Sequence, residues 1–547
     1  MKLSKTIKVL QTLDSQILFN LKNDITEEAL NNIFSKDDFP CINLIYQINQ
    51  LITNKANKPE EIEKYKQIFY NNRHLFPELN INVNTLFNKE NTILSVSSCI
   101  NIIERILKYG KFKNNQICEL NDEYISIIIL LNVFETTIDE KNDLNADEKD
   151  IIELYLSIIS YNQFSNDIDN SNFFRLRYIY EHYLKQNKNL LNQFKKFYGY
   201  SLDNYLIFLQ LFLLLGKHNN TFIDKNIFND TDNAKEIINC INDSIFNYKS
   251  QNDKDKIIIN SYIPSQYILK KPIIEINNKY FVINPDILLK RIYSFFFEKI
   301  KASYTSEKDY HRNFYGPLFE NYCRDVAKNV CIRSNFKYYE FINEFKYYIN
   351  KEENFSSDFY IIFNDTVIIF EIKSTARYKE TTINVDLKNK SKFISDEIQY
   401  KVIKPFNQIE KRLSEIKTLN PNNYPNIPLS KIQNATKYYY VIVSEETIMN
   451  NYRIYNNYLS KINSIHSKVP PLYLNVTEFE YFLMSLLKRK KPINKVIDYY
   501  HENYYNCNFS DFIMKERKSF KFDRLDVIEN KNISHYIKKV LNKSENE

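Results

Sequence analysis

Three residues, Asp358, Glu371 and Lys373, have side chains that could bind a metal ion and assist a hydrolytic reaction. Carboxylate oxygens are ligands that Mg²⁺ prefers, and a carboxylate-bound Mg²⁺ can place and activate a water for attack on a phosphodiester. On this interpretation Asp358 and Glu371 bind the metal, and the backbone carbonyl of Ile372 is a further ligand. Lys373 would orient or polarise the attacking water, or neutralise charge that develops on the phosphate.

The elements predicted around these residues bring them together. Two apolar runs flank Asn364-Asp365, a dipeptide suited to a two-residue hairpin turn. Counting outward from that turn places Asp358 opposite Glu371, where β-carbons are about 5 Å apart, and like charges so placed destabilise a strand pair. Lys373 points to the same face because side chains alternate along a strand. The pattern therefore predicts a compensating cation. The other predicted pairs are Phe363–Thr366, Ile361–Ile368 and Tyr360–Ile369.

One helix is predicted before the hairpin and another after it. The first is expected to begin at Gly316-Pro317 with Glu320 in its first turn, where a carboxylate by itself commonly only favours the positive helix end. The second is expected from Lys404-Pro405 and leaves Gln408 on its flank. Apolar stripes at intervals of three and four define the buried faces: Phe319, Tyr322, Cys323, Val326 and Val330 in the first, and Phe406, Ile409, Leu413 and Ile416 in the second.

Further strands are predicted near residues 336–341 and 437–443, so the order is helix, strand, strand, strand, helix, strand. An Asp followed after twelve residues by Glu-x-Lys, within this order, resembles the core of the PD-(D/E)xK nuclease superfamily, which has the restriction-endonuclease-like fold. The resemblance covers residues 309–445, about a quarter of the chain. Ser357 stands where the family name has Pro, at a position that varies in the superfamily.

The resemblance implies roles for two more residues. The family's first core helix often carries a Glu that helps to bind the metal, which Glu320 matches, and its later helix often carries a Gln near the site, which Gln408 matches. The implied activity is a Mg²⁺- or Mn²⁺-dependent endonuclease that hydrolyses phosphodiester bonds of DNA, with RNA left open as a substrate. Nucleases of this architecture with large helical additions resemble bacterial restriction or anti-phage defence effectors.

Two other functions stay open beside this one. The chain could be a catalytically inactive, nuclease-like protein that binds nucleic acid or acts as a scaffold. A strand-cleaving transposition or repair subunit would share the site and differ only in its partner.

The expected fold class is α+β with several domains. Residues 1–250 are predicted to be an all-helical regulatory or partner-binding region, because apolar residues recur there at intervals of three and four; a protein partner or a second copy of the chain is expected to bind it. Residues 251–304 form a hairpin–helix connector with a turn at Asn277-Asn278. Residues 305–450 form the αβββαβ nuclease-like core, and residues 451–547 a helical, basic C-terminal region.

Basic residues cluster where they could contact phosphate. Such clusters by themselves commonly lie on a solvated face, and the net charge of +7 is mild. Beside a candidate nuclease centre, phosphate contact is favoured. The predicted nucleic-acid-binding residues are Lys388, Lys390, Lys392, Lys404, Arg412, Lys488, Arg489, Lys490 and Lys491.

Composition argues against several other classes of protein. The four glycines stand far apart, whereas phosphate-binding loops need closely spaced glycines, so an NTPase, a Rossmann enzyme or a protein kinase is not expected. Seven scattered cysteines without a C-x-x-C indicate reduced thiols in a cytoplasmic protein. The most apolar run, residues 205–215, is too short to span a bilayer, and residues 143–154 lack the Gly and Glu of a calcium-binding loop.

Overall fold

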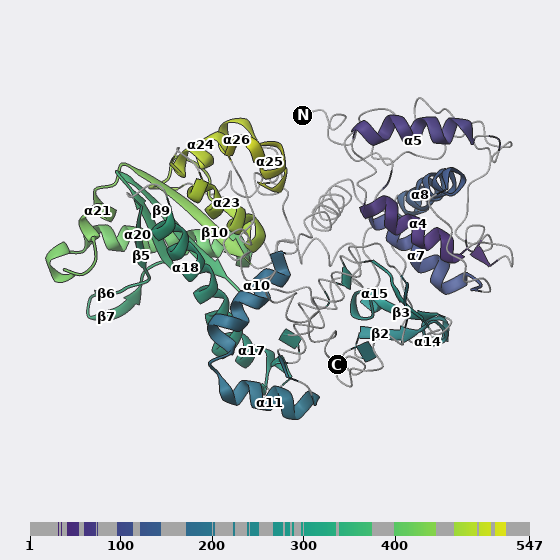
Figure 1. The fold of residues 1–547 in the computed structure, drawn as a ribbon. Coiled ribbons are helices and arrows are strands. Elements are labelled where there is room, and N and C mark those ends of the chain that lie inside the picture. The colour runs from purple at the N-terminus through teal and green to yellow at the C-terminus, as the bar shows by residue number, and fades with distance from the viewer. Residues whose placement is uncertain are drawn as a thin grey trace, which may run out of the picture. The chain divides into compact units, whose positions relative to one another are not determined.

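The computed structural model describes residues 41–53, 59–72, 96–112, 121–143, 171–199, 222–224, 241–250, 266–276, 279–284, 304–334, 339–374, 399–444, 464–488, 492–504 and 509–520, with a few isolated positions between them. The chain is a mixed α and β protein that divides into two compact units (Figure 1). The first contains residues 1–151 and 188–297, and the second residues 152–187 and 298–547. No helix in the described ranges combines the length and apolar character needed to cross a membrane.

The first unit packs helices around an isoleucine-rich core. Ile45, Ile103 and Ile128 are each at most 1 % exposed and belong to one cluster. They come from three helices whose apolar stripes face one another. The helices described in this unit are α4 (Cys41–Thr53), α5 (Pro59–Asn71), α7 (Val96–Tyr109), α8 (Asp122–Asp143), α11 (Lys188–Tyr198), α14 (Ile245–Ser250) and α15 (Gln266–Lys270).

A four-stranded sheet of order β1-β4-β3-β2 completes this unit. Strands β3 (Ile273–Ile276) and β4 (Lys279–Val282) form the predicted hairpin, with Ile276 paired to Lys279. Strands β1 (Phe222–Asp224) and β2 (Asn242–Ser244) lie within the region predicted to be all-helical, so that prediction was wrong there. Each has three residues, too few for an alternating pattern to appear in the sequence.

The second unit is built on a five-stranded mixed sheet of order β11-β10-β9-β8-β5. Strand β9 is antiparallel to β8 and parallel to β10. The predicted order of helix, three strands, helix and strand is present, with the hairpin β6–β7 inserted after β5. The elements described from α17 to β10 are α17 (Glu307–Tyr310), η4 (His311–Tyr315), α18 (Gly316–Arg333), β5 (Glu340–Asn343), β6 (Lys346–Ile349), β7 (Glu352–Phe355), β8 (Phe359–Phe363), β9 (Thr366–Lys373), η6 (Gln399–Ile403), α20 (Lys404–Thr418), η7 (Pro421–Asn423), α21 (Leu429–Gln433) and β10 (Lys437–Ser444).

The C-terminal region contributes a strand as well as helices. Strand β11 (Leu472–Asn475) pairs in parallel with β10 and leads directly into α23 (Val476–Lys488). Residues 451–547 were predicted to be helical, and for residues 472–475 this was wrong. A four-residue apolar run cannot be distinguished from a buried helical turn by periodicity alone. The helices that follow are α24 (Asn494–Asn503), α25 (Phe509–Lys515) and α26 (Arg517–Phe520).

The central hairpin has the predicted register. Phe363 pairs with Thr366, Ile361 with Ile368 and Tyr360 with Ile369. Asn364 occupies the turn with a φ of 54°, a left-handed conformation that Asn tolerates better than most residues. The last described pair is Phe359–Phe370, so one further step places Asp358 opposite Glu371.

Helices cover both faces of this sheet. Side chains of α20 pack on one face, where Phe406, Ile409 and Leu413 join Tyr360 and Ile369 in a single core cluster. The other face packs on α18 and α23, and the stacked rings of Phe359 and Phe370 contact Phe479 of α23 there. The predicted apolar stripes of α18 and α20 are buried. The hairpin end with Asp358 and Glu371 is therefore enclosed between helices.

A segment far from the sheet in sequence also belongs to this unit. Helix α10 (Ser171–Ile179) carries Arg175, whose Nε lies 2.8 Å from Oε1 of Glu480 on α23. The hydroxyl of Tyr322 on α18 donates to the same oxygen at 2.6 Å. Arg175 and Glu480 are 2 % and 3 % exposed, so this network joins three helices inside the unit.

Candidate active site

Asp358 occupies a buried position immediately before β8. It is 8 % exposed, and its Oδ2 accepts a hydrogen bond from the backbone N–H of Ile372. Burial raises the pKa of Asp358, and the nearby charges of Glu371 and Glu320 raise it further, while Lys373 and the Ile372 N–H act in the opposite direction. The unfavourable charge balance predicted from the register is therefore present around Asp358.

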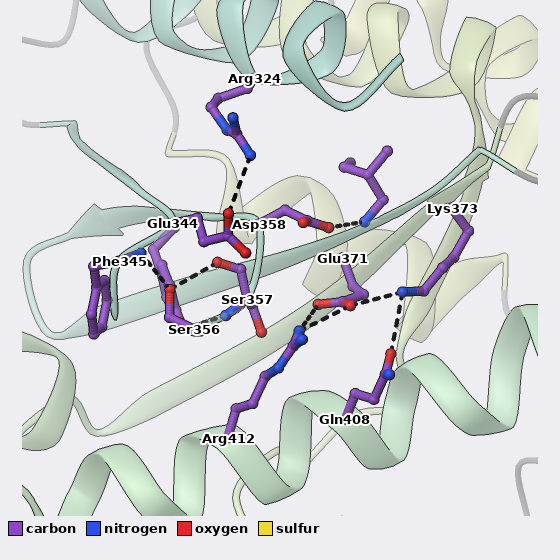
Figure 2. Close-up of polar contacts among 12 residues, drawn as sticks. Arg324, Glu344, Phe345, Ser356, Ser357, Asp358, Glu371, Lys373, Gln408 and Arg412 are labelled. Atoms are coloured by element: carbon purple, nitrogen blue, oxygen red, sulfur yellow. Dashed lines mark hydrogen bonds and ion pairs between the residues drawn. The ribbon is translucent and has the colours of Figure 1, made fainter. Parts of the chain in front are cut away.

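Glu371 is 2 % exposed and has both carboxylate oxygens occupied by cations. Nζ of Lys373 lies 2.8 Å from its Oε1, and Nη1 of Arg412 lies 3.0 Å from Oε1 and 2.8 Å from Oε2 (Figure 2). Such charge-assisted bonds are stronger than neutral hydrogen bonds. Lys373 was predicted to join the site and does so. Arg412 was predicted to contact nucleic acid, which stays a prediction; the structure places its guanidinium against Glu371.

Gln408 reaches the same group from α20. Its Oε1 accepts a hydrogen bond from Nζ of Lys373 at 3.2 Å. Gln408 and Arg412 are four residues apart and therefore lie on one face of the helix, and both point toward the end of β9 (Figure 2). This spacing was the sequence signal that could have assigned Arg412 to the site.

Glu320 comes from α18, on the other side of the sheet. The first residue of this helix approaches β9 closely, because a Cβ added to Gly316 would lie 3.3 Å from Oγ of Ser374. Burial raises the pKa of Glu320, with Lys373 lowering it and Glu344 raising it. Glu320 therefore shares the electrostatic environment of the hairpin residues.

Glu344 is a fourth acidic residue at this end of the sheet, and it was not predicted. Its backbone N–H donates to the carbonyl of Asp358 at 3.0 Å, and its carboxylate lies 3.9 Å from Nη2 of Arg324 on α18. Burial raises its pKa, which Arg324 and Arg412 counteract. The polar sequence after β5 does not indicate that Glu344 lies beside Asp358. That position depends on the pairing of β5 with β8, a later strand of the chain.

A β-bulge at Ser357 accounts for the position of Asp358. Three residues, 356–358, separate the paired residues Phe355 and Phe359, whereas their partners Lys346 and Asn343 are separated by two, 344–345. Ser357 is the additional residue, and its N–H donates to the hydroxyl of Tyr360 at 3.0 Å. Bulges of this kind change the direction of side chains next to active sites. Ser357 Oγ is buried and has no hydrogen-bond partner among the described residues.

The donors at this end of the sheet suit a hard divalent cation by their chemistry. They are carboxylate oxygens and a backbone carbonyl, and the mutual repulsion around Asp358 is what a cation would relieve. In the described part of the chain, however, no three His, Cys, Asp or Glu side chains lie close enough together to hold a metal ion. Glu371 is turned to Arg412 and Lys373 instead.

The predicted basic residues are described only in part. Lys404 is exposed at the first residue of α20. Lys488 is the last residue of α23, and its side chain lies outside the described residues. The other six predicted residues lie wholly outside the described ranges: Lys388, Lys390, Lys392, Arg489, Lys490 and Lys491.

No protein-family model, curated protein or solved structure matches this chain. Its function is therefore inferred from the residues of this site and their surroundings.

Proposed function

We propose that this chain is a divalent-metal-dependent nuclease that hydrolyses phosphodiester bonds of DNA. The observation that supports this most is the group formed by Asp358, Glu371 and Lys373 at one end of the β8–β9 hairpin, with Gln408 bonded to Lys373. Two buried carboxylates and an amine have the donor chemistry of a metal site with an adjacent proton donor or charge-neutralising group.

Each residue has a part in this proposal. Asp358, Glu371, Glu320 and the Ile372 carbonyl would hold Mg²⁺ or Mn²⁺ once Glu371 turns from Arg412 and the carboxylates draw together, and the bound ion would supply Lewis acidity and an activated water. Lys373 is held by Glu371 and Gln408, so its ammonium group is oriented before substrate arrives. An oriented ammonium can hold the attacking water or stabilise charge that develops on the phosphate.

The proposal includes a biological setting, which the resemblance described above supports. The chain would act in the cytoplasm as a bacterial restriction or anti-phage defence effector. Residues 1–250 would bind a protein partner, sense a signal, or pair with a second copy of the chain. RNA is the alternative substrate to DNA.

One observation favours a second candidate function. Arg412 occupies both oxygens of Glu371, a carboxylate that a metal ion would need. A catalytically inactive, nuclease-like protein that binds nucleic acid or acts as a scaffold could keep this ion pair permanently.

Cleavage assays with the full-length chain test the proposal. Plasmid, linear duplex, single-stranded DNA and RNA are incubated with Mg²⁺ or Mn²⁺ and, where activity needs them, with partners from the source cell. Asp358→Ala and Lys373→Ala are each expected to abolish cleavage while nucleic-acid binding is retained. Lys431→Ala is the matched control, because it removes a lysine of the same unit whose Nζ lies 2.6 Å from Glu340, in an exposed ion pair.

The outcomes separate the two candidate functions. The nuclease is supported if metal-dependent cleavage is lost in both variants and retained in Lys431→Ala. Absence of cleavage of every substrate, together with unchanged nucleic-acid binding and biological activity in Asp358→Ala, contradicts the nuclease and supports the scaffold.

A further inference from the structure

The β6–β7 hairpin is joined directly to the candidate site. The N–H of Ser356 donates to the carbonyl of Phe345 at 2.9 Å, and the N–H of Glu344 donates to the carbonyl of Asp358 at 3.0 Å. These bonds continue the β5–β8 ladder across the bulge into the β6–β7 pair. Phe355, at the end of β7, is therefore only three residues from Asp358.

One face of this hairpin is anchored to the body of the unit. Tyr347 is 1 % exposed and donates from its hydroxyl to Oε2 of Glu415 on α20 at 2.6 Å. The N–H of Tyr348 donates to the hydroxyl of Tyr424 at 3.1 Å. The turn residues Asn350 and Lys351 have φ values of 52° and 70°, as in the tight turns that match strand twist. The hairpin is thus held in one position.

The opposite face presents two aromatic rings to solvent. Tyr348 is 54 % exposed and Phe355 is 43 % exposed. The register pairs Lys346 with Phe355 and Tyr348 with Glu353, so both rings are diagonal neighbours on one face. Among the large apolar side chains that are exposed in the described ranges, these are the two that share one hairpin; the others are Tyr70, Phe246, Ile332 and Ile465.

The charges on this face nearly cancel. Nζ of Lys346 lies 2.9 Å from Oε1 of Glu353 and 5.2 Å from the ring centroid of Phe355. The hairpin carries two lysines, Lys346 and Lys351, and two glutamates, Glu352 and Glu353. A ligand would therefore be held mainly by the rings, because little net charge is available to attract it.

We propose that this aromatic face stacks unpaired bases of a single-stranded nucleic acid and guides that strand toward Asp358. Exposed aromatic rings stack on any base, whereas bases in a duplex already stack on one another. The anchored back face keeps the rings in place and so reduces the ordering that binding requires. That the strand is guided toward Asp358 rests on the proposed nuclease function. The inference deepens that function by naming single-stranded nucleic acid as the ligand of this face.

Tryptophan fluorescence can test the contact directly, because the chain has no Trp. Tyr348→Trp places a single reporter on the hairpin, and Tyr70→Trp places one of nearly equal exposure, 52 %, on α5 of the first unit. Both full-length proteins are titrated with a single-stranded oligodeoxynucleotide in EDTA, so that cleavage cannot occur. We expect saturable quenching of the hairpin reporter, no change at the control reporter, and much weaker quenching by the matched duplex.

Removal of the rings gives an independent measurement. Tyr348→Ala and Phe355→Ala are each expected to weaken single-strand binding about tenfold, with Tyr348→Phe close to the wild-type chain. The loss should be nearly independent of salt, because stacking rather than phosphate contact is removed. Thermal unfolding should be unchanged, since both side chains are exposed.

The possible results distinguish this inference from the nuclease proposal. An unresponsive Tyr348→Trp reporter, or wild-type binding by both alanine variants, overturns the stacking face even if the chain cleaves DNA. Quenching by the single strand without any cleavage supports the stacking face and contradicts the catalytic proposal. If the fluorescence per molecule of Tyr348→Trp changes with protein concentration in the absence of nucleic acid, the face is a self-association surface and the inference is overturned.

Discussion

Arg412 donates from Nη1 to both carboxylate oxygens of Glu371, at 3.0 and 2.8 Å. Burial lowers the pKa of Arg412, but the negative charges of Glu371 and Asp358 outweigh burial and raise it. Arg412 therefore keeps its charge, and its guanidinium contacts both oxygens of Glu371. The metal ion that we propose at Glu371 would compete with Arg412 for this carboxylate.

Arg412→Ala is expected to lower the free energy of unfolding by about 2 kcal/mol without metal, because a buried carboxylate loses its main partner. Mg²⁺ should then stabilise the variant more than it stabilises the wild-type chain, since a bound ligand shifts the unfolding equilibrium by mass action. Thermal unfolding with and without Mg²⁺ measures both effects.

Arg324→Ala is the matched control for this prediction. Arg324 is exposed to a similar extent, 20 % against 24 %, but its guanidinium lies 3.9 Å from Glu344. It should change stability less and leave the response to Mg²⁺ as in the wild-type chain. Equal responses in all three proteins would contradict the competition between Arg412 and metal.

Asp358→Asn is expected to stabilise the second unit at pH 7. The pKa of Asp358 is raised in the folded chain, first by burial and then by Glu371 and Glu320. The folded state therefore binds the proton more tightly than the unfolded state, and this carboxylate costs stability increasingly as pH rises above its unfolded pKa of 3.8. Asn removes the charge and keeps an oxygen for the Ile372 N–H. Denaturant unfolding should show a gain of about 1 kcal/mol at pH 7 that shrinks as pH falls; a loss of stability would contradict it.

Alanine substitutions of the adjacent residues Ser356 and Ser357 are expected to differ in their effect on the free energy of unfolding. Both are at most 1 % exposed. Oγ of Ser356 accepts from the N–H of Phe345 at 2.9 Å and donates to the carbonyl of Ser357 at 3.0 Å, so Ser356→Ala should cost about 1–3 kcal/mol. Ser357→Ala should be neutral or slightly stabilising, because its Oγ has no hydrogen-bond partner in the described structure. Equal losses in denaturant unfolding would show that the Ser357 hydroxyl has a role that this arrangement does not explain.

Acid should destabilise the second unit through His501. Burial lowers the pKa of His501 from 6.5 to about 4, with Asp498 opposing the shift. Between these values the unfolded chain binds the proton and the folded chain does not, so stability falls as pH falls through this window. The contribution should reach about 2 kcal/mol near pH 4.5.

His501→Gln is expected to flatten this part of the pH profile in denaturant unfolding. His74→Gln, which replaces an exposed histidine of the first unit, is the control and should keep the wild-type profile. A His501→Gln profile that parallels the wild-type chain would contradict the assignment.

Local patterns in the sequence were sufficient to predict the central hairpin and the helices beside it. Turn chemistry at Asn364 and alternation of side chains set the register from Phe363–Thr366 outward, because both depend on residues close in the chain. The stripes that bury Phe319 on α18 and Phe406 on α20 depend likewise on spacing within one helix.

Tertiary structure alone decided which residues far apart in the chain come into contact. Arg412 reaches Glu371 over 41 residues of sequence, and Arg175 reaches Glu480 over 305. Glu344 lies beside Asp358 because a bulge at Ser357 and an inserted hairpin shape the ladder there. Such contacts depend on how helices and strands pack together. The hydrophobic period, the residue propensities and the turn type each describe only one element by itself. The sequence by itself therefore determined the acidic hairpin and its lysine, and packing determined that Glu371 is held by an arginine.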